Sequence, residues 1–324
     1  MTITINLVTK NNDQTIKNTL ESIKELKAKI LIGDLGSKDN TIKICRQYEN
    51  AEIIPISLNN SMSIAKNLLI KKCKTEWMFF IDPWEVIISG FEDINSLSNS
   101  KDKNAYNVNF LQNDLITKET RLWHKDKNLQ FKNPVFETVP NVGLETEIYL
   151  VSNNNIKNPL KIELLDQWRS NKPLSNEPLY YLSCVHLSNK EWDKFLNLAD
   201  LYLYKEVSVT MSFIMTQYYC AMVKCYVKEQ QDYNKAIGYI LNCIEHKPLM
   251  AEFWCLLGDV FYAVSEYEKS ICFYENAIIL GSKRLKSDAW PMEISKYKEY
   301  PNKMIKICNN LKSTVCNYIN DTKE

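Results

Sequence analysis

The spacing of apolar residues in the first half of the chain predicts strands that alternate with helices. Short β-branched or continuous apolar runs predict buried strands, and they lie at residues 3–8, 29–34, 51–57 and 77–81. Apolar residues at three-to-four spacing predict amphipathic helices between them, at residues 15–26, 40–48 and 63–73. Repeated strand–helix–strand units indicate a parallel sheet covered on both faces. Such sheets bind ligands at the carboxyl ends of their strands.

The pattern changes twice further along the chain. Shorter strands with irregular links are expected at residues 106–111, 121–124 and 147–151. The polar, turn-rich segment 153–159 then predicts a domain boundary, with the stretch 171–178 as the alternative. Beyond that stretch the spacing is helical throughout. We therefore expect an α/β domain over residues 1–165 and an all-α domain over residues 166–324.

One segment of the second half matches the opening of a tetratricopeptide repeat, a helix–turn–helix unit of about 34 residues. The W-x2-L-G-x2-Y pattern of that repeat is matched, with Phe in place of Tyr, by Trp254, Leu257, Gly258 and Phe261. The later small, aromatic and small positions of the repeat are filled by Ser270, Tyr274 and Ala277. This spacing favours core packing for the aromatic residues over a ligand groove.

Earlier copies of the repeat are weaker. The positions 34 residues before Ser270 and Ser282 hold Ala236 and Pro248, a small residue and a proline, which are the types that the repeat requires. A second repeat is thus predicted over about residues 217–250, and a degenerate third over residues 186–216. A helix near residues 302–318 is expected to cap the stack, because a terminal repeat cannot leave its apolar face open.

Composition and charge exclude several classes of function. Apolar residues make up 45% and charged residues 24%, as in soluble globular proteins. The 40 basic and 39 acidic residues leave no broad positive field for nucleic acid. Ten cysteines without a C-x-x-C pair, and three unclustered histidines, predict buried thiols in a reducing compartment and no zinc site. No leader and no apolar run of ~20 residues is present, so we expect a cytoplasmic protein without a membrane span.

The segment from Gly33 to Thr41 carries candidate chemistry, because it follows a strand and opens a helix. At the strand end Asp34 can accept hydrogen bonds from a base or a ribose. Gly36 and Ser37 suit a tight turn, and Asp39 or Asn40 can cap the next helix. A plain capped loop explains this segment equally well when it is taken alone.

Four other short motifs accompany that segment, and together the five lie in order at residues 8–13, 34–41, 63–67, 77–85 and 121–137. They resemble the Lys-Asn-Glu loop, D-x-G-S-x-D-x-T, S-x-A-R-N, D-x-D-E and R-L-F…V-H-E segments of the family 2 glycosyltransferases. The closest likeness is to the bacterial type that carries tetratricopeptide repeats. This resemblance implies a GT-A domain, with a Rossmann-like mixed sheet, followed by a tetratricopeptide-like helical domain.

The resemblance also implies site residues. The nucleotide-sugar donor, preferentially a UDP-sugar, would contact Thr9, Asn11, Asp34, Gly36, Ser37, Asp39, Lys66, Asp82 and Arg121. Among these, Lys66 would lie near the diphosphate, where the family often has arginine; lysine keeps the charge but loses the bidentate fork. The acceptor hydroxyl would be deprotonated by Glu137, or alternatively by Glu85.

Two departures from the family pattern concern its metal ion. The second aspartate of D-x-D is Trp84, and the histidine of V-H-E is Phe136. Mg²⁺ or Mn²⁺ requires oxygen or nitrogen ligands, and of the expected ligands only Asp82 remains. The metal site is therefore predicted to be lost or rebuilt. A replacement cation would then have to offset the charge of the leaving group, and the candidates are Lys10, Lys66, Arg121 and His124.

Two functions fit these observations. The first is an inverting glycosyltransferase that moves a sugar from a nucleotide-sugar to a protein, peptide or glycan, with the repeat domain presenting the acceptor. The second is a catalytically inactive GT-A relative that acts as a nucleotide-sugar sensor or as a protein-interaction module. Other chemistries have no support, because the G-x-G-x-x-G, phosphate-loop and G-x-S-x-G motifs are all missing from the sequence.

Overall fold

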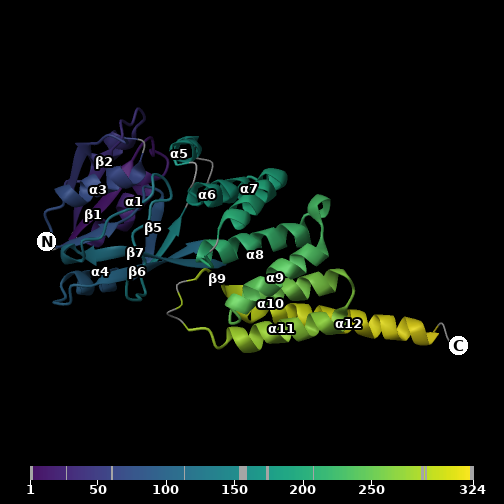
Figure 1. Cartoon of the computed structure of the whole chain (residues 1–324). Helices are drawn as coiled ribbons and strands as arrows, with labels where there is room; N and C mark the ends of the chain where they lie inside the picture. The colour runs from purple at the N-terminus through teal and green to yellow at the C-terminus, as the bar shows by residue number, and fades with distance from the viewer. Residues whose placement is uncertain are drawn as a thin grey trace. The chain divides into compact units, whose positions relative to one another are not determined.

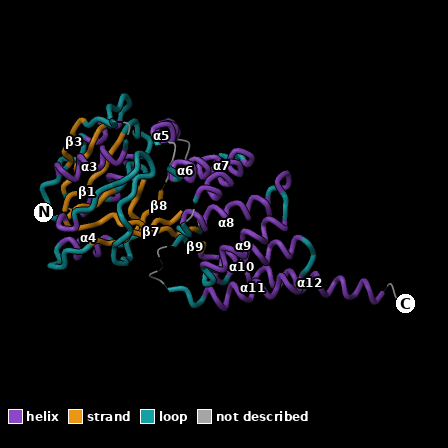
Figure 2. Tube along the Cα trace, viewed as in Figure 1, coloured by secondary structure: helices purple, strands orange, loops and turns teal. Residues whose placement is uncertain are grey.

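The chain forms two compact units, Met1–Pro173 and Leu174–Glu324. The computed structural model describes residues 3–26, 28–59, 61–112, 114–152, 159–172, 175–206, 208–285, 288 and 290–321. The first unit contains a mixed sheet with helices on both faces, whereas the second is built mainly from helices (Figures 1 and 2).

The elements of the first unit alternate between strand and helix as far as β4, as the sequence predicts, and are mostly strands after it. They are β1 (Ile3–Thr9), α1 (Ile16–Ser22), η1 (Lys24–Leu26), β2 (Lys29–Asp34), α2 (Thr41–Cys45), β3 (Ala51–Pro55), α3 (Met62–Lys72), β4 (Trp77–Phe80), β5 (Glu85–Ser89), α4 (Phe91–Ser98), β6 (Ala105–Gln112), β7 (Leu115–His124), η2 (Lys125–Lys127), β8 (Tyr149–Ser152) and α5 (Pro159–Asn171).

The strands of this unit lie in the order β3-β2-β1-β4-β7-β6-β8-β5. The first four are parallel, and β7 adds to β4 in the antiparallel direction. Strands β2 and β3 are added on one side of β1, and β4 is added on its other side. The order of the strands therefore reverses between β1 and β4. Such a switch point opens a crevice at the carboxyl ends of the strands, which is where ligands bind in open α/β sheets.

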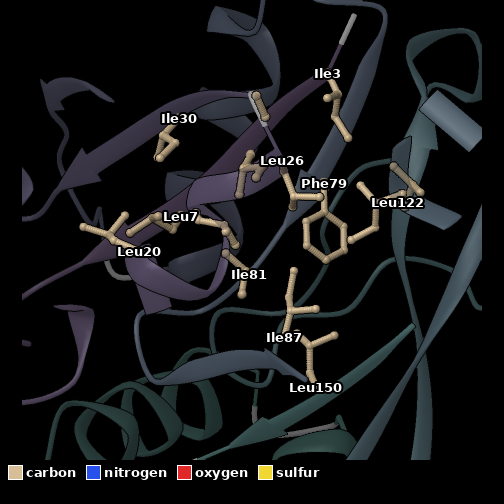
Figure 3. Packing of buried hydrophobic residues seen from close by; sticks show 14 of the residues in the cluster. Ile3, Leu7, Leu20, Leu26, Ile30, Phe79, Ile81, Ile87, Leu122 and Leu150 are labelled. Atoms are coloured by element: carbon tan, nitrogen blue, oxygen red, sulfur yellow. The ribbon is translucent and has the colours of Figure 1, made fainter. Parts of the chain in front are cut away.

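Both faces of the sheet are covered, so every residue of the central strands β1 and β4 is buried, including the polar residues of β1. In β1, Ile5 and Leu7 pack with α1 on one face, whereas Val8 belongs to the core on the other face, under α3. The side chains of β4 divide in the same way between the two cores. In Figure 3, the side chains of Leu7, Phe79, Ile81 and Leu122 belong to one such cluster.

Most predicted elements of the first half are confirmed, with shorter helices than expected at α1 and α2. Four elements differ from the prediction. Strand β5 and helices α4 and α5 were not anticipated, and β7 begins at Leu115 rather than at Arg121. The missed half of β7 carries charged and polar residues and is only half-buried, so its apolar pattern is too weak to indicate a strand.

The second unit consists mainly of helices, as predicted, and its successive helices contact each other in pairs. Its elements are α6 (Glu177–Ser188), α7 (Trp192–Lys205), α8 (Met211–Tyr226), η3 (Lys228–Gln230), α9 (Tyr233–His246), α10 (Ala251–Ala263), α11 (Tyr267–Gly281), β9 (Met292–Glu293), η4 (Ile294–Tyr297) and α12 (Glu299–Asp321). Helices α9 and α11 begin at Tyr233 and Tyr267, which are 34 residues apart. The predicted terminal helix is confirmed as part of α12. The assignment of these pairs to the tetratricopeptide class stays a prediction.

None of the helices that the structure describes combines the length and the apolar character needed to cross a bilayer. The nine cysteines whose side chains the structure describes are free thiols, and six of them are buried: Cys45, Cys220, Cys225, Cys243, Cys255 and Cys308. Burial raises the pKa of Cys45 to about 11, so its thiol stays protonated and packs as a small apolar group.

Candidate active site

Three predicted site residues lie together at the carboxyl ends of the parallel strands. Thr9 and Asp34 are paired neighbours at the ends of β1 and β2. On the other side of β1, the Ile81 N–H donates to the Asn6 carbonyl at 3.1 Å, and Asp82 follows directly. The sheet thus places Asp34 and Asp82 on opposite sides of β1, at the switch point.

The loops after β1 and β2 bind each other through a network of short hydrogen bonds. Asp34 Oδ1 accepts from the Ser37 hydroxyl at 2.7 Å, and the Asn11 N–H donates to the Ser37 oxygen at 3.0 Å. The Lys38 N–H donates in turn to Asn11 Oδ1 at 2.7 Å. Gly36 has a φ of 84°, which only glycine adopts without strain, so the turn depends on it.

Asp39 completes this network. It accepts hydrogen bonds from the N–H groups of Asp13 and Thr41, at 3.1 and 3.0 Å. The Thr9 hydroxyl donates to Asn12 Oδ1 at 2.9 Å. Although burial alone would raise the pKa of Asp39, the hydrogen bonds from Thr41 and Asp13 lower it below its ordinary value. The predicted nucleoside-binding residues therefore form one preorganised loop pair.

Lys66 lies at the centre of the charged part of the site. Its side chain is 2% exposed, and Nζ contacts Asp82 Oδ1 at 2.7 Å and Glu137 Oε1 at 2.8 Å. Burial would lower the pKa of Lys66, but the carboxylates of Asp82 and Glu137 outweigh that effect and raise it above its ordinary value. The ammonium group is therefore charged, and it bridges the carboxylates of the D-x-D and V-H-E segments.

Helix α3 also holds the loop that carries Glu137. Asn67 accepts from the Phe131 N–H and donates to the Phe131 carbonyl, both at 2.9 Å, as a paired strand residue would. The Met62 N–H donates to the Pro134 carbonyl at 2.8 Å. Sequence reasoning assigned no role to Asn67, although it is the final residue of the S-x-A-R-N match. Its amide fixes the loop next to Lys66.

Phe136 has a positive φ of 50°, which is strained for a bulky side chain. A left-handed conformation of this kind costs about 1–2 kcal/mol for an L-residue. The contacts of α3 with the loop on one side and the Lys66–Glu137 ion pair on the other hold the residue in this conformation. The backbone at Phe136 therefore sets the direction from which Glu137 reaches Lys66.

Arg121 reaches the site because β7 contains a bulge. The pairing of β6 with β7 moves from Tyr106–Leu122 to Asn107–Thr120, so Arg121 is the extra residue. Its Nη2 contacts Glu85 Oε1 at 3.4 Å and Glu119 Oε2 at 2.9 Å. Its Nη1 atom is buried and has no hydrogen-bond partner among the described residues.

Glu85 is buried and contacts the backbone that precedes it. Glu85 Oε2 accepts from the Asp82 N–H at 2.7 Å, while Oε1 faces Arg121. Burial raises the pKa of Glu85 to about 7, even though the Arg121 charge acts to lower it. Glu85 therefore positions Asp82, and both of its carboxylate oxygens are already engaged.

The raised pKa of Glu85 predicts a pH-dependent stability. Since the folded protein keeps this proton where the unfolded chain has released it, the free energy of unfolding should fall as the pH rises from about 5 to about 7. Urea unfolding of wild type and Glu85→Gln, followed across this range, tests the expectation. The variant should lose that part of the pH dependence, whereas Glu119→Gln should keep it; an unchanged profile in Glu85→Gln would contradict the assignment.

The residues at the expected metal positions do not fit a divalent cation. The side chains of Trp84 and Phe136 offer no oxygen ligand, and one carboxylate oxygen each of Asp82 and Glu137 contacts the Lys66 ammonium. The described ranges hold no group of three or more His, Cys, Asp or Glu side chains arranged for a metal ion.

The candidate replacement cations are separated by the fold. Lys66 and Arg121 lie in the site, and Lys10 is exposed next to Thr9. The expectation for His124 was wrong, because His124 pairs with Trp77 at the opposite end of β4, about 16 Å from Asp82 at ~3.3 Å per residue. His124 is buried there against the Trp77 ring, at 5.2 Å between centroids.

Comparison with protein families agrees with this geometry. Residues 4–178, more than half of the chain, match the family model described as glycosyl transferase family 2. The chain belongs to glycosyl transferase family 2. The predicted class, a GT-A domain with a mixed sheet followed by a helical domain, is confirmed for this family member.

Individual relatives match it more weakly. The SPbeta prophage-derived glycosyltransferase SunS of Bacillus subtilis (strain 168) is 33% identical over 82 residues, which are 25% of this chain and 19% of SunS. The chain thus spans about a fifth of the length of the curated relatives it matches. Among solved structures, S. aureus TarS in complex with UDP is 12% identical with a TM-score of 0.39, covering 94% of this chain and 91% of that one.

The mannosyltransferase PcManGT of Pyrobaculum calidifontis, in complex with GDP-Man and Mn²⁺, is 11% identical to this family 2 chain with a TM-score of 0.42. The match covers 87% of this chain and 88% of that one.

Proposed function

We propose that this family 2 protein is an inverting glycosyltransferase that works without a divalent metal. Its donor is a nucleotide-sugar, in the first instance a UDP-sugar, and its acceptor is a hydroxyl group on a protein, peptide or glycan. The free cysteines fit a reducing compartment such as the cytoplasm. The observation that carries the proposal is the position of Lys66 between Asp82 and Glu137.

An ammonium in this position does part of what a bound cation would do. A metal ion held by both carboxylates would lie close to Lys66 Nζ, which contacts one oxygen of each at 2.7 and 2.8 Å. The two cations exclude each other, since like charges repel strongly in a buried site. Lys66 therefore compensates the acidic side chains and opposes the binding of a shared metal.

The reaction needs one base and one displacement. The Glu137 carboxylate takes the proton of the acceptor hydroxyl, and the acceptor oxygen forms a bond to the anomeric carbon from the face opposite the leaving group. The bond from that carbon to the diphosphate oxygen breaks, and its electron pair leaves with the nucleoside diphosphate. Glu137 suits this role better than Glu85, since Glu85 is occupied by Arg121 and the Asp82 backbone.

Charge on the departing diphosphate must be offset by the protein. The proposal assigns this task to Lys66 and to the exposed Lys10 at the end of β1, with the network at Asp34 and Asp39 holding the nucleoside. Preorganised charges of this kind are typically worth about 10²–10³ in rate each.

Turnover with and without metal tests the proposal. Purified full-length protein is incubated with UDP-sugars and assayed for released UDP, in EDTA and in Mn²⁺. We expect donor hydrolysis or transfer at the same rate in both. A rate that depends strongly on Mn²⁺ would overturn the metal-independent mechanism, and turnover of another nucleotide-sugar alone would overturn the UDP preference.

A second candidate is a non-catalytic relative, and the aromatic residues Trp84 and Phe136 at the metal positions favour it. Calorimetry with UDP and UDP-sugars separates the two functions. Binding without any turnover would identify a nucleotide-sugar sensor. If no nucleotide binds, the protein is an interaction module instead.

A further inference from the structure

The connection between α11 and α12 is unusually long for a stack of helix pairs. It runs from residue 282 to residue 298, 17 residues between Gly281 and Glu299, whereas helix–helix connections in bundles commonly take about 2–8. The connection includes β9 and η4.

This connection covers one face of α10, defined by Glu252, Cys255 and Asp259 and called the α10 acidic face below. The three residues are spaced so that they share one side of the helix. Glu252 and Asp259 are 3% and 6% exposed, although carboxylates are rarely buried unless they are paired. Their partners come largely from the connection and from the start of α12.

At Glu252 the connection supplies a cation, a hydroxyl and a main-chain donor. The Glu293 N–H donates to Glu252 Oε1 at 2.8 Å, and the Tyr297 hydroxyl donates to Oε2 at 2.9 Å. Arg284 Nη1 lies 3.7 Å from Oε1 and also contacts the Tyr297 hydroxyl. Burial raises the pKa of Glu252, while Arg284 and these hydrogen bonds act to lower it.

At Asp259 the same kinds of group recur. The Tyr300 hydroxyl donates to Oδ1 at 2.6 Å, and Lys296 Nζ lies 4.0 Å from Oδ2. Tyr274 of α11 donates to Oδ1 at 2.5 Å, and Tyr226 of α8 donates to Oδ2. The last two belong to the helix pairs themselves and remain with the face when the connection is removed.

Two further hydrogen bonds join the connection to α10 and α8, one of them to its main chain. The Cys255 thiol donates to the Lys296 carbonyl at 3.4 Å. On the neighbouring helix α8, the Tyr218 hydroxyl donates to Glu293 Oε1 at 3.0 Å. The connection therefore contacts two successive helix pairs through its backbone and its polar side chains, as an extended peptide ligand would.

The core of the helix pairs lies on the other side of α10. Phe253, Leu256, Leu257 and Val260 pack with α8 and α9 in one apolar cluster. Without the connection, α10 would lose the contact of this cluster with Trp290 but would keep its packing with α8 and α9, and it would expose two carboxylates, which water solvates readily. The connection is thus held by polar contacts with Glu252 and Asp259 and by the packing of the Trp290 and Tyr297 rings against two neighbouring apolar clusters.

We propose that the α11–α12 connection is an intramolecular ligand, and that the α10 acidic face is a binding site for an extended peptide with a basic residue next to tyrosine. The Lys296–Tyr297 pair shows the recognised chemistry, a cation for Asp259 and a hydroxyl for Glu252. A partner segment of this kind replaces the connection when it binds. The inference stands without the transferase activity, because it concerns peptide binding alone.

A peptide in trans tests this site. The probe is a fluorescein-labelled peptide with the sequence of residues 290–300, added to full-length protein and followed by fluorescence anisotropy. The triple variant Arg284→Ala, Tyr297→Phe, Tyr300→Phe weakens the internal ligand and leaves the face intact. We expect this variant to bind the probe at least tenfold more tightly than wild type, which has its own segment in place.

Two controls make the result specific. Adding Glu252→Gln and Asp259→Asn to the triple variant should weaken binding at least tenfold, and a probe with alanine at the Lys296 and Tyr297 positions should not bind. Equal binding by wild type and the folded triple variant, or no binding by that variant, would overturn the proposal.

Hydrogen exchange on wild type covers the case in which the triple variant fails to fold. Excess unlabelled probe should speed exchange of the Glu293 amide, which donates to Glu252. Unchanged exchange at saturating probe would likewise overturn the proposal.

Discussion

Replacing Glu137 with glutamine is expected to reduce glycosyl transfer by about 10²–10⁴-fold, the usual contribution of a general base. Glutamine has nearly the same shape and keeps an oxygen that can face Lys66, so the loop from Phe131 to Glu137 should stay in place. What the variant loses is the carboxylate that takes the acceptor proton. Initial rates of transfer and calorimetric binding of the nucleotide, measured on the same preparation, check both statements.

Glu85→Gln is the matched control for this experiment. Glu85 contacts the Asp82 N–H and Arg121, so its removal should change the pH dependence of stability more than the chemical step. If Glu85→Gln instead loses as much transfer as Glu137→Gln while nucleotide binding is retained, the roles of the two glutamates are exchanged.

Replacing Lys66 with methionine is expected to destabilise the first unit by about 3–5 kcal/mol, the typical cost of removing one partner from a buried ion pair. Methionine fills a similar volume but leaves the Asp82 and Glu137 carboxylates without their shared cation. The midpoint of urea unfolding should fall accordingly, and transfer should be lost with it. Lys66→Arg keeps the charge and should retain much of the stability.

An exposed ion pair of the same length provides the comparison. Lys103 Nζ lies 2.7 Å from Asp126 Oδ2, but the two side chains are 60% and 47% exposed. Because exposed pairs contribute little, Lys103→Met should leave the unfolding midpoint nearly unchanged. A loss in Lys66→Met no larger than in Lys103→Met would show that Lys66 is not the cation that compensates the site.

The strands that position the site could be predicted from the sequence, whereas most of the contacts within the site could not. Strands β2 and β4 contain continuous apolar runs and β1 is rich in β-branched residues, because both faces of the sheet are covered, so all three are easily identified. The positions of Asp34 and Asp82 follow from those strand ends. No local pattern could predict the burial of Lys66, since lysine is usually exposed and its two partners lie 16 and 71 residues further along the chain.

The geometry of β7 explains the remaining differences. Arg121 and His124 are three residues apart in sequence, yet only Arg121 reaches the carboxyl end of β4, because β7 runs antiparallel to β4. The bulge at Arg121 also changes which side chains of β7 point to each face of the sheet, and it exists only because β7 pairs with β6. Pairing of this kind is a tertiary property, so periodicity along one strand cannot reveal it.

The hydrogen bonds of the loop pair described above join residues within the stretch from Thr9 to Thr41, whereas the ion pairs around Lys66 draw on residues from 66 to 137. The two halves of the site can therefore diverge separately in evolution. A lineage could lose Glu137 and keep a fully formed nucleotide loop. It could equally exchange its nucleotide preference, through residues 9–41, under an unchanged base. A family member of this architecture thus has a short route from enzyme to nucleotide-binding protein, and the same route can be followed in the opposite direction by design.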